Sequence, residues 1–439
     1  MTLVGILLEP KQHSKTERNM KQIFIKIFLG FSLLGSTHLT YAQPNYPPPT
    51  GVWCSCPPST GVGNGSVVPD VANKSYVNGI LVRVVWKDIE PMDDTYNWLL
   101  IDDQITAAAS YGKKISLAVG GGPNTPQWLY GLGANSISYS LPFSGTMPIP
   151  WDAIFLDKWT DFISELGSRY QNDTTIQLVY ITNSSQNGFE MQIPYNPTPS
   201  YTSIGYTDQL VIDSWTQIMD VYNVAFPNHY LTNDFHPVNT SDAVADSVYN
   251  YAIVNLGSRY GANAWWWTQN NTSVYPSQYS ILKNSANSNA FSGIQMAASG
   301  VTNPSSFGTG GMPEALNLAI SNNVCYWEIW SNDITDGSFD SLLSIATCSV
   351  LNLEENTKIE NNLTVYPNPS HSFFTITLKL NNIQEIEVIN ELGQTIFRKE
   401  NIKNSQYSLD IGNSIDGIFF LKVTDDKKTI SYRKIILKK

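Results

Sequence analysis

Short apolar runs alternate with amphipathic segments between residues 51 and 350. The run Ile176–Ile181 is mostly apolar, which is typical of a strand buried in a parallel sheet. The segment Phe155–Tyr170 places apolar residues three and four positions apart, which is typical of a helix that packs one face on a sheet. The predicted strands are Gly51–Cys56, Gly79–Trp86, Lys114–Val119, Ile176–Ile181, Tyr230–Asp234, Ala262–Thr268, Gly293–Ala297 and Val324–Trp330. The predicted helices are Trp98–Tyr111, Phe155–Tyr170, Leu210–Tyr222, Ala243–Leu256, Gln278–Asn284, Pro313–Ser321 and Ser338–Ala346.

Eight strands that alternate with helices over about 300 residues predict one (β/α)8 TIM barrel, assigned to residues 43–350. A doubly wound open sheet is the alternative. That fold usually carries a glycine-rich turn after its first strand, and Cys54–Gly65 has no GxGxxG motif. We therefore expect the chemistry at the C-terminal ends of the strands, where a TIM barrel keeps its active site.

The pattern changes after residue 350. A Glu- and Asn-rich linker is expected at 351–362, and short alternating strands separated by turns follow at 363–439. These strands predict an all-β, immunoglobulin-like antiparallel sandwich. The strands are Leu363–Tyr366, Phe373–Leu378, Glu385–Ile389, Thr395–Arg398, Tyr407–Asp410, Ile418–Val423 and Thr429–Ile436.

Residues 1–42 have the pattern of a secretory signal peptide. Lys21 precedes the short apolar segment Ile23–Leu34, and small or polar residues follow up to Ala42. Met20 lies where the true start of such a signal would be. The apolar segment is too short to cross about 30 Å of hydrocarbon, so we expect no membrane span in the mature protein.

Composition limits the partners of the chain. It has 42% hydrophobic residues and a formal net charge of -11. Nine Lys and Arg face twenty-four Asp and Glu between residues 43 and 350. Because nucleic acids are bound by clustered Lys and Arg, this balance argues against a nucleic-acid partner. It also disfavours strongly sulfated or uronic sugars, and no cofactor is expected.

The four cysteines are Cys54, Cys56, Cys325 and Cys348. The first and eighth strands of a closed barrel are neighbours, so we expect a disulfide across this seam in an exported protein. A metal site is the alternative, but CxC spacing without a neighbouring His is a weak ligand set.

Glu190 is the first candidate for catalysis. It follows the strand at Ile176–Ile181, and its neighbours are Phe189 and Met191. Apolar surroundings raise the pKa of a carboxyl group, as a general acid requires. The alternative is an exposed loop glutamate.

Three segments resemble glycoside hydrolases with TIM barrels. They are the W-x-x-I-E-P…Y-x-W segment in Val82–Asp102, the TP-x-W-L loop in Gly112–Leu129, and Asn187–Tyr201, which resembles the acid loop of beta-amylases. The resemblance implies a secreted enzyme that cleaves O-glycosidic bonds of a poly- or oligosaccharide with two carboxylates, one of which protonates the leaving oxygen.

The second carboxylate is less obvious than the first. In the commonest clan of these enzymes it follows the seventh strand, where this chain has Gln295. Glu328 on the eighth strand is the replacement candidate, and a buried structural role beside Arg83 is its alternative. Asp234 is a third candidate. Gln295 also motivates a competing interpretation, a non-catalytic carbohydrate-binding pseudoenzyme.

Aromatic and polar residues at the strand ends are candidates for substrate binding, because pyranose faces stack on aromatic rings. Part of this set is expected to be barrel core, since alternate residues of a strand point to opposite faces. The candidates are Trp86, Trp128, Asn187, Asp234, His236, Trp267 and Trp330.

The tail resembles the C-terminal sorting domain of Bacteroidetes proteins exported by the type IX secretion system. The resemblance is carried by Tyr366–Ser370, Val388–Ile396, Gly417–Val423 and the basic end Lys434–Lys439. It implies contact with that machinery and passage through the periplasm and outer membrane. A carbohydrate-binding sandwich is the alternative, which the absence of Trp after residue 350 disfavours.

Overall fold

The computed structural model describes residues 44–56, 66–288, 291–346, 363–379, 381–390, 395–427 and 430–438. The chain divides into two compact units, one ending at Ala346 and the other beginning at Thr347. Within the residues described, no helix is both long and apolar enough to cross a membrane.

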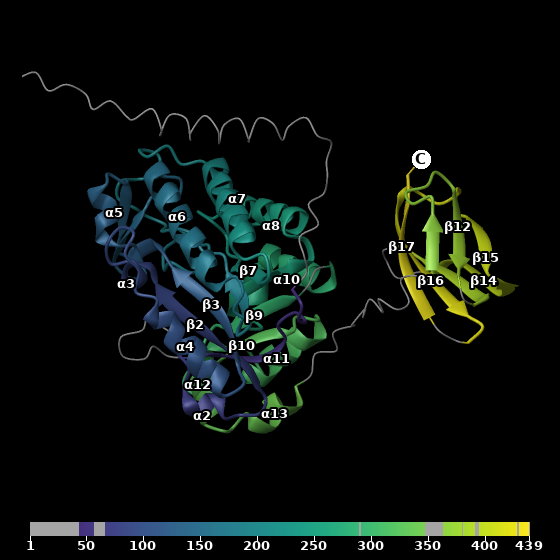
Figure 1. The fold of residues 1–439 in the computed structure, drawn as a ribbon, viewed down its shortest axis with the longest axis horizontal. Helices are drawn as coiled ribbons and strands as arrows, with labels where there is room; N and C mark the ends of the chain where they lie inside the picture. The colour runs from purple at the N-terminus through teal and green to yellow at the C-terminus, as the bar shows by residue number, and fades with distance from the viewer. Residues whose placement is uncertain are drawn as a thin grey trace, which may run out of the picture. The chain divides into compact units, whose positions relative to one another are not determined.

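The first unit is a closed barrel of eight parallel strands inside a ring of helices (Figure 1). The predicted fold class and all eight predicted strands are confirmed. In barrel order the strands are β1 (Gly51–Ser55), β2 (Val77–Val85), β3 (Lys114–Gly120), β6 (Ile176–Tyr180), β7 (Tyr230–Asp234), β8 (Tyr260–Trp267), β9 (Ser292–Met296) and β10 (Tyr326–Trp330). β1 pairs in parallel with β10, and this pairing closes the barrel.

Each predicted helix is present, while α2, α3, α5, α9 and α12, of four or five residues each, were not predicted. Asp152 caps α6 by accepting hydrogen bonds from the backbone N–H groups of Ile154 and Phe155, which explains where this helix begins. The helices are α2 (Pro69–Ala72), α3 (Trp86–Ile89), α4 (Leu99–Ser110), α5 (Gln127–Gly131), α6 (Ala153–Tyr170), α7 (Asp208–Ala225), α8 (Ala243–Asn255), α9 (Asn271–Val274), α10 (Pro276–Ser288), α11 (Gly311–Ser321), α12 (Ser331–Thr335) and α13 (Asp340–Ile345).

A hairpin that the sequence analysis missed is inserted between β3 and α6. Its strands are β4 (Ser136–Tyr139) and β5 (Gly145–Pro148). The backbone of Ser138 exchanges two hydrogen bonds with that of Thr198, at 2.7 and 2.8 Å. The hairpin is therefore tied to the long loop that follows β6.

The prediction of a disulfide that links the first strand to the eighth is wrong, because both cysteines of the first strand are bonded to each other. Cys54 is bonded to Cys56, two residues further along, with Cα atoms 5.3 Å apart. Cys325 also takes part in a disulfide, while Cys348 lies outside the described residues. The prediction considered only disulfides between different strands. In the structure Cys54 and Cys56 bond to each other, so neither is left to bridge the first and eighth strands.

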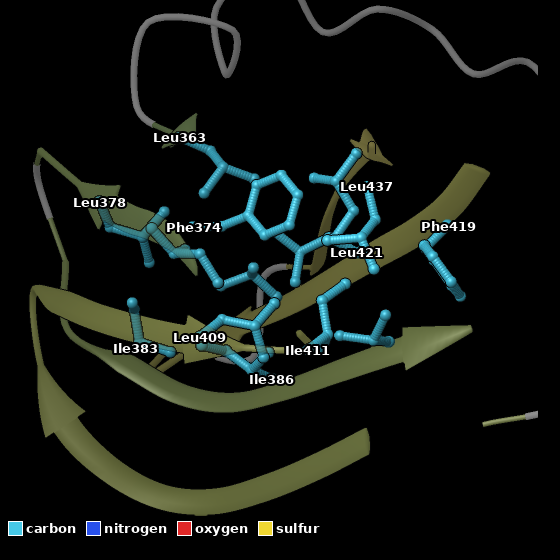
Figure 2. Packing of buried hydrophobic residues seen from close by; sticks show 14 residues of the cluster. Leu363, Phe374, Leu378, Ile383, Ile386, Leu409, Ile411, Phe419, Leu421 and Leu437 are labelled. Carbon is cyan, nitrogen blue, oxygen red and sulfur yellow. The ribbon is translucent and has the colours of Figure 1, made fainter. Parts of the chain in front are cut away.

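The second unit consists of two antiparallel sheets, in the orders β11-β12-β15 and β14-β13-β16-β17. Their apolar faces share one core, in which Phe374 and Leu421 are fully buried (Figure 2). The predicted all-β sandwich is confirmed. Its strands are β11 (Leu363–Tyr366), β12 (Phe373–Leu378), β13 (Ile383–Ile389), β14 (Thr395–Asn404), β15 (Gln406–Asp410), β16 (Gly417–Asp425) and β17 (Ile430–Leu437).

Candidate active site

Glu190 lies on the loop that follows β6, at the C-terminal end of the barrel strands. Three glycines, Gly120 to Gly122, end β3 beside this loop. A Cβ on Gly120 would lie 2.5 Å from the Phe189 ring, and one on Gly122 would lie 2.0 Å from the carbonyl oxygen of Ser185. Gly122 also has a φ of 55°, which favours glycine. The glycine run thus lets the loop pack directly against the end of β3.

Glu190 belongs to a cluster with Asn187, Asp234 and His236. The Nδ2 group of Asn187 donates a hydrogen bond of 2.7 Å to Oε1 of Glu190. The other carboxylate oxygen, Oε2, lies 3.7 Å from Nε2 of His236. Nδ1 of His236 is 2.5 Å from Oδ2 of Asp234, and Oδ1 of Asp234 accepts the backbone N–H of Trp265 at 2.6 Å. Asp234, the last residue of β7, therefore orients His236 toward Glu190.

Burial sets the proton affinity of this cluster. Burial raises the pKa of Glu190. The charge of His236 lowers this pKa and the charge of Asp234 raises it, and the net shift is upward. Burial lowers the pKa of His236, but the charge and hydrogen bond of Asp234 outweigh it, so that this pKa is also raised. Phe189 and Met191 are buried, and the direction predicted for Glu190 is confirmed. Its side chain is 23% exposed, so a ligand can reach it.

Glu328 lies inside the barrel, with no exposed surface. Its Oε1 accepts hydrogen bonds from the hydroxyl groups of Tyr180 and Tyr326, at 2.6 and 2.5 Å. Its Oε2 accepts one from Nε2 of Gln295, at 2.8 Å. Burial raises the pKa of Glu328, and these three donors and the charge of Arg83 oppose that rise without cancelling it.

Arg83 connects the two carboxylates electrostatically. Its guanidinium interacts with the charges of both Glu328 and Glu190. It lies over the rings of Trp265 and Trp330, 5.6 and 5.8 Å from their centroids. Burial lowers the pKa of Arg83, and the nearby carboxylates oppose this effect. Its position favours anionic forms of the carboxylates on either side.

Several predicted binding residues are not exposed to a ligand. Trp86 is fully buried against Trp159 of α6 and donates from Nε1 to Glu90. Trp267 is fully buried and donates from Nε1 to the carbonyl oxygen of Ala315. Neither ring is open to a ligand in this structure, so a contact with sugar would require the surrounding side chains to move. The apolar pattern places them on strand ends but does not distinguish the helix-facing side from the exposed end.

The remaining predicted residues fall into two groups. Asn187, Asp234 and His236 support Glu190 from behind, and the last two are buried. Trp128 and Trp330 are partly exposed, so their rings remain candidates for stacking. Trp330 borders a cavity of about 510 Å³, formed by residues that follow β9 and β10.

Sequence analysis missed several residues of the site. Tyr275 packs edge-on against His236, with 5.4 Å between ring centroids. Tyr180 and Tyr326 supply the hydroxyl groups that surround Glu328. The glycine run at Gly120–Gly122 was a usable signal, since three consecutive glycines after a strand indicate close approach of another backbone.

Two groups of side chains in the described residues offer enough ligand atoms for a metal ion. Glu190, Asp234 and His236 have ligand atoms within 4.8 Å of one another, as do Glu90, Asp93 and Asp94. In the first group both oxygens of Asp234 already accept hydrogen bonds. Oε1 of Glu190 likewise accepts a hydrogen bond from Asn187, so hydrogen bonds already organise this group.

Comparison with known families identifies the tail. Residues 364–438 match the family described as a secretion system C-terminal sorting domain. The predicted resemblance of the tail is thereby confirmed. It indicates export through the type IX system, followed by secretion or attachment to the cell surface.

Individual proteins resemble parts of the chain. An endo-acting ulvan lyase from Formosa agariphila is 26% identical over 132 residues, which are 30% of this chain. The chain matches only 25% of that protein's length. Among solved structures, the catalytic domain of beta-amylase from Paenibacillus polymyxa has a TM-score of 0.45 at 10% identity, covering 68% of this chain and 99% of its own. Endo-glycoceramidase II from Rhodococcus sp. has a TM-score of 0.40 at 9% identity, covering 84% of this chain and 99% of its own.

Proposed function

We propose that this chain is an exported glycoside hydrolase that cleaves O-glycosidic bonds of a poly- or oligosaccharide with two carboxylates. The observation that carries the proposal is the state of Glu190. It is reachable from solvent, its pKa is raised, and a histidine lies 3.7 Å away. A carboxyl group whose pKa is raised holds its proton to a higher pH, and it can give that proton to a leaving oxygen.

Glu190 is the general acid in this proposal. When it gives up its proton, the protonated form of His236 would stabilise the carboxylate that remains, and Asp234 favours that form and orients the ring. Asn187 fixes the rotamer of Glu190 by its hydrogen bond to Oε1. These three residues position and tune the acid.

Glu328 is the proposed second carboxylate, which attacks the sugar or activates water. Its charge is supported by two tyrosine hydroxyl groups, one amide and Arg83. Because Glu328 is fully buried in this conformation, catalysis requires the ring of a neighbouring side chain to move before a sugar reaches it. Trp265 is the side chain that we expect to move, since its Nε1 group donates to the Tyr180 hydroxyl at 3.2 Å, next to Glu328.

The decisive test compares Glu190→Gln and Glu328→Gln on two substrates, an unactivated polysaccharide and an aryl glycoside with a good leaving group. Loss of the acid should impair mainly the unactivated substrate, because a good leaving group needs little protonation. Loss of the second carboxylate should impair both. Full activity of both variants on a glycan that the wild type cleaves would refute the assignment.

A non-catalytic carbohydrate-binding protein is the second candidate. The burial of Glu328 and its hydrogen bond from Gln295 favour it, since an amide cannot attack or accept a proton at this position. A wild-type protein that binds glycans and cleaves none across a broad panel would support this candidate. Gln295→Glu would then be the variant to examine for gained activity.

Export precedes either activity. We propose residues 1–42 as the signal peptide, 43–350 as the barrel, 351–362 as a linker and 363–439 as the sorting domain of a Bacteroidetes protein. A chain that lacks residues 351–439 should accumulate in the periplasm of a host with a type IX system. If the truncated chain appeared at the cell surface, the sorting role proposed for residues 363–439 would be contradicted.

A further inference from the structure

The cavity beyond β9 and β10 is lined by none of the residues proposed above as catalytic. It measures about 510 Å³ and lies between residues 297–306 and 330–332. Both segments follow the C-terminal ends of barrel strands. The cavity therefore opens on the same face of the barrel as Glu190.

The lining carries no charged side chain and mixes polar groups with apolar surface from Ala297, Ala298 and Trp330. It combines hydroxyl and amide groups with one aromatic ring, from Ser299, Thr302, Asn303, Trp330, Ser331 and Asn332 among others. Trp330 is fixed by a hydrogen bond of 2.6 Å from Nε1 to the carbonyl oxygen of Met296. The nearby Arg83 lies over the Trp330 ring and donates to Ser55, but it is not part of the lining.

A buried carboxylate holds one wall of the cavity in place. Oδ1 of Asp333 accepts the Ser299 hydroxyl at 2.7 Å and the backbone N–H of Val301 at 2.9 Å. Its Oδ2 accepts the backbone N–H of Gly300 at 3.0 Å. Because Asp333 belongs to α12, these bonds tie the loop after β9 to the helix after β10. A wall held in this way loses little conformational entropy when a ligand binds.

We propose that this cavity is a subsite for one uncharged sugar residue of the glycan. The proposal deepens the proposed function and rests on a carbohydrate being the ligand. Hydroxyl and amide groups can exchange hydrogen bonds with sugar hydroxyls, and the partly exposed Trp330 ring offers an apolar face. A uronate or sulfate group would lose hydration without gaining a cation from the lining, so charged sugars are excluded.

Binding is measured by isothermal titration calorimetry on the full chain carrying Glu190→Gln, so that cleavage does not interfere. The probes are neutral oligosaccharides of glucose, mannose, xylose and galactose, and oligomers of uronic acids. Asn303→Ala and Asn332→Ala should each weaken the best neutral oligosaccharide about three- to tenfold, the effect of losing one hydrogen bond. Asn228→Ala removes an equally exposed asparagine at the opposite end of the barrel and should leave affinity unchanged.

Introducing a positive charge sharpens the assignment. Asn332→Lys should create measurable uronate binding and weaken the neutral ligand. Unchanged affinity in both asparagine variants would place the sugar elsewhere. If the Glu190→Gln protein without a cavity substitution bound uronates more tightly than neutral oligosaccharides, the proposed ligand class would be wrong. Absence of binding across the whole panel would also overturn the subsite. Binding without turnover by the wild type would refute the hydrolase but keep the subsite, so the two proposals fail separately.

Discussion

Two carboxylates near the centre of the barrel have the same direction of pKa shift but opposite surroundings. Glu190, on the loop after β6, is 23% exposed and faces a charged or chargeable histidine. Glu328, inside the barrel, is fully buried and faces three uncharged hydrogen-bond donors. Burial raises the pKa of both groups.

The difference shows that a raised pKa alone does not identify a general acid. A proton is useful in catalysis only if the substrate can approach the group that carries it. At Glu190 the polar partners lie behind the carboxyl group and leave part of it open. At Glu328 donors occupy both oxygens, an arrangement that also stabilises the barrel interior. Four experiments test this contrast.

The largest expected effect is on turnover at Glu190. Glu190→Gln keeps the size of the side chain but removes the transferable proton, so kcat on an unactivated polysaccharide should fall about 10²- to 10⁴-fold. The folded structure should be retained. Steady-state kinetics measure kcat, and circular dichroism measures the retention of the fold. A fully active Glu190→Gln enzyme would show that Glu190 is not the general acid.

The second effect is on stability at Glu328. Glu328→Ala leaves three donors without an acceptor and opens a cavity, so the free energy of unfolding should fall by about 3–5 kcal/mol. Glu190→Ala, at a partly exposed position, serves as the control and should cost far less. Urea denaturation of both variants gives the two free energies of unfolding. Equal losses of stability would contradict the proposed difference between Glu328 and Glu190.

A smaller effect is expected at Tyr180. Tyr180→Phe keeps the ring but removes one donor to Glu328 and the acceptor of Asn263 and Trp265, so the free energy of unfolding should fall by about 1–3 kcal/mol. Tyr279→Phe is a suitable control because Tyr279 lies outside this network. If both variants unfold at the same urea concentration, the hydroxyl group of Tyr180 does not support Glu328.

The smallest effect concerns the pH dependence of stability. The folded protein holds its protons on Glu190 more tightly than the unfolded chain, so stability should fall as pH rises above about 4.5, the ordinary pKa of a glutamate. His236 adds a loss of the same sign above its ordinary value of about 6.5. Glu190→Gln should flatten the decline at its lower end. An equally steep decline in this variant would mean that Glu190 titrates normally in the folded state.

The barrel was predictable because each buried strand has its own apolar run and each helix its own spacing. Ends of elements were missed by a few residues, as at α6, which begins at Ala153 because Asp152 caps it. The β4–β5 hairpin was missed because its strands have four residues each, too few for a clear alternation. The cysteine pairing was missed because strand neighbours were considered and CxC closure was not.

The site was only partly predictable. Glu190 was predicted because a carboxylate after a buried strand is a local signal, and Asp234 and His236 were predicted from their place at the end of the next strand; their roles stay predictions. Their mutual arrangement depends on contacts between β7 and the loop after β6, which no local pattern encodes. The burial of Trp86 was not predicted, because a ring at a strand end can turn toward α6 as readily as toward solvent.

The β4–β5 hairpin has a consequence for how this protein can change over evolutionary time. The Tyr139 hydroxyl donates to the carbonyl oxygen of Gln186, and Nε2 of Gln186 donates to that of Leu141. The loop that carries Glu190 is therefore held by an inserted segment as well as by the end of β3. Insertions and substitutions in the hairpin can retune the reach of Glu190 while the strand register stays intact. Variation that alters activity should accordingly concentrate at the exposed positions of residues 136–148, because Ile137, Tyr139 and Met147 are buried in the hairpin's own core.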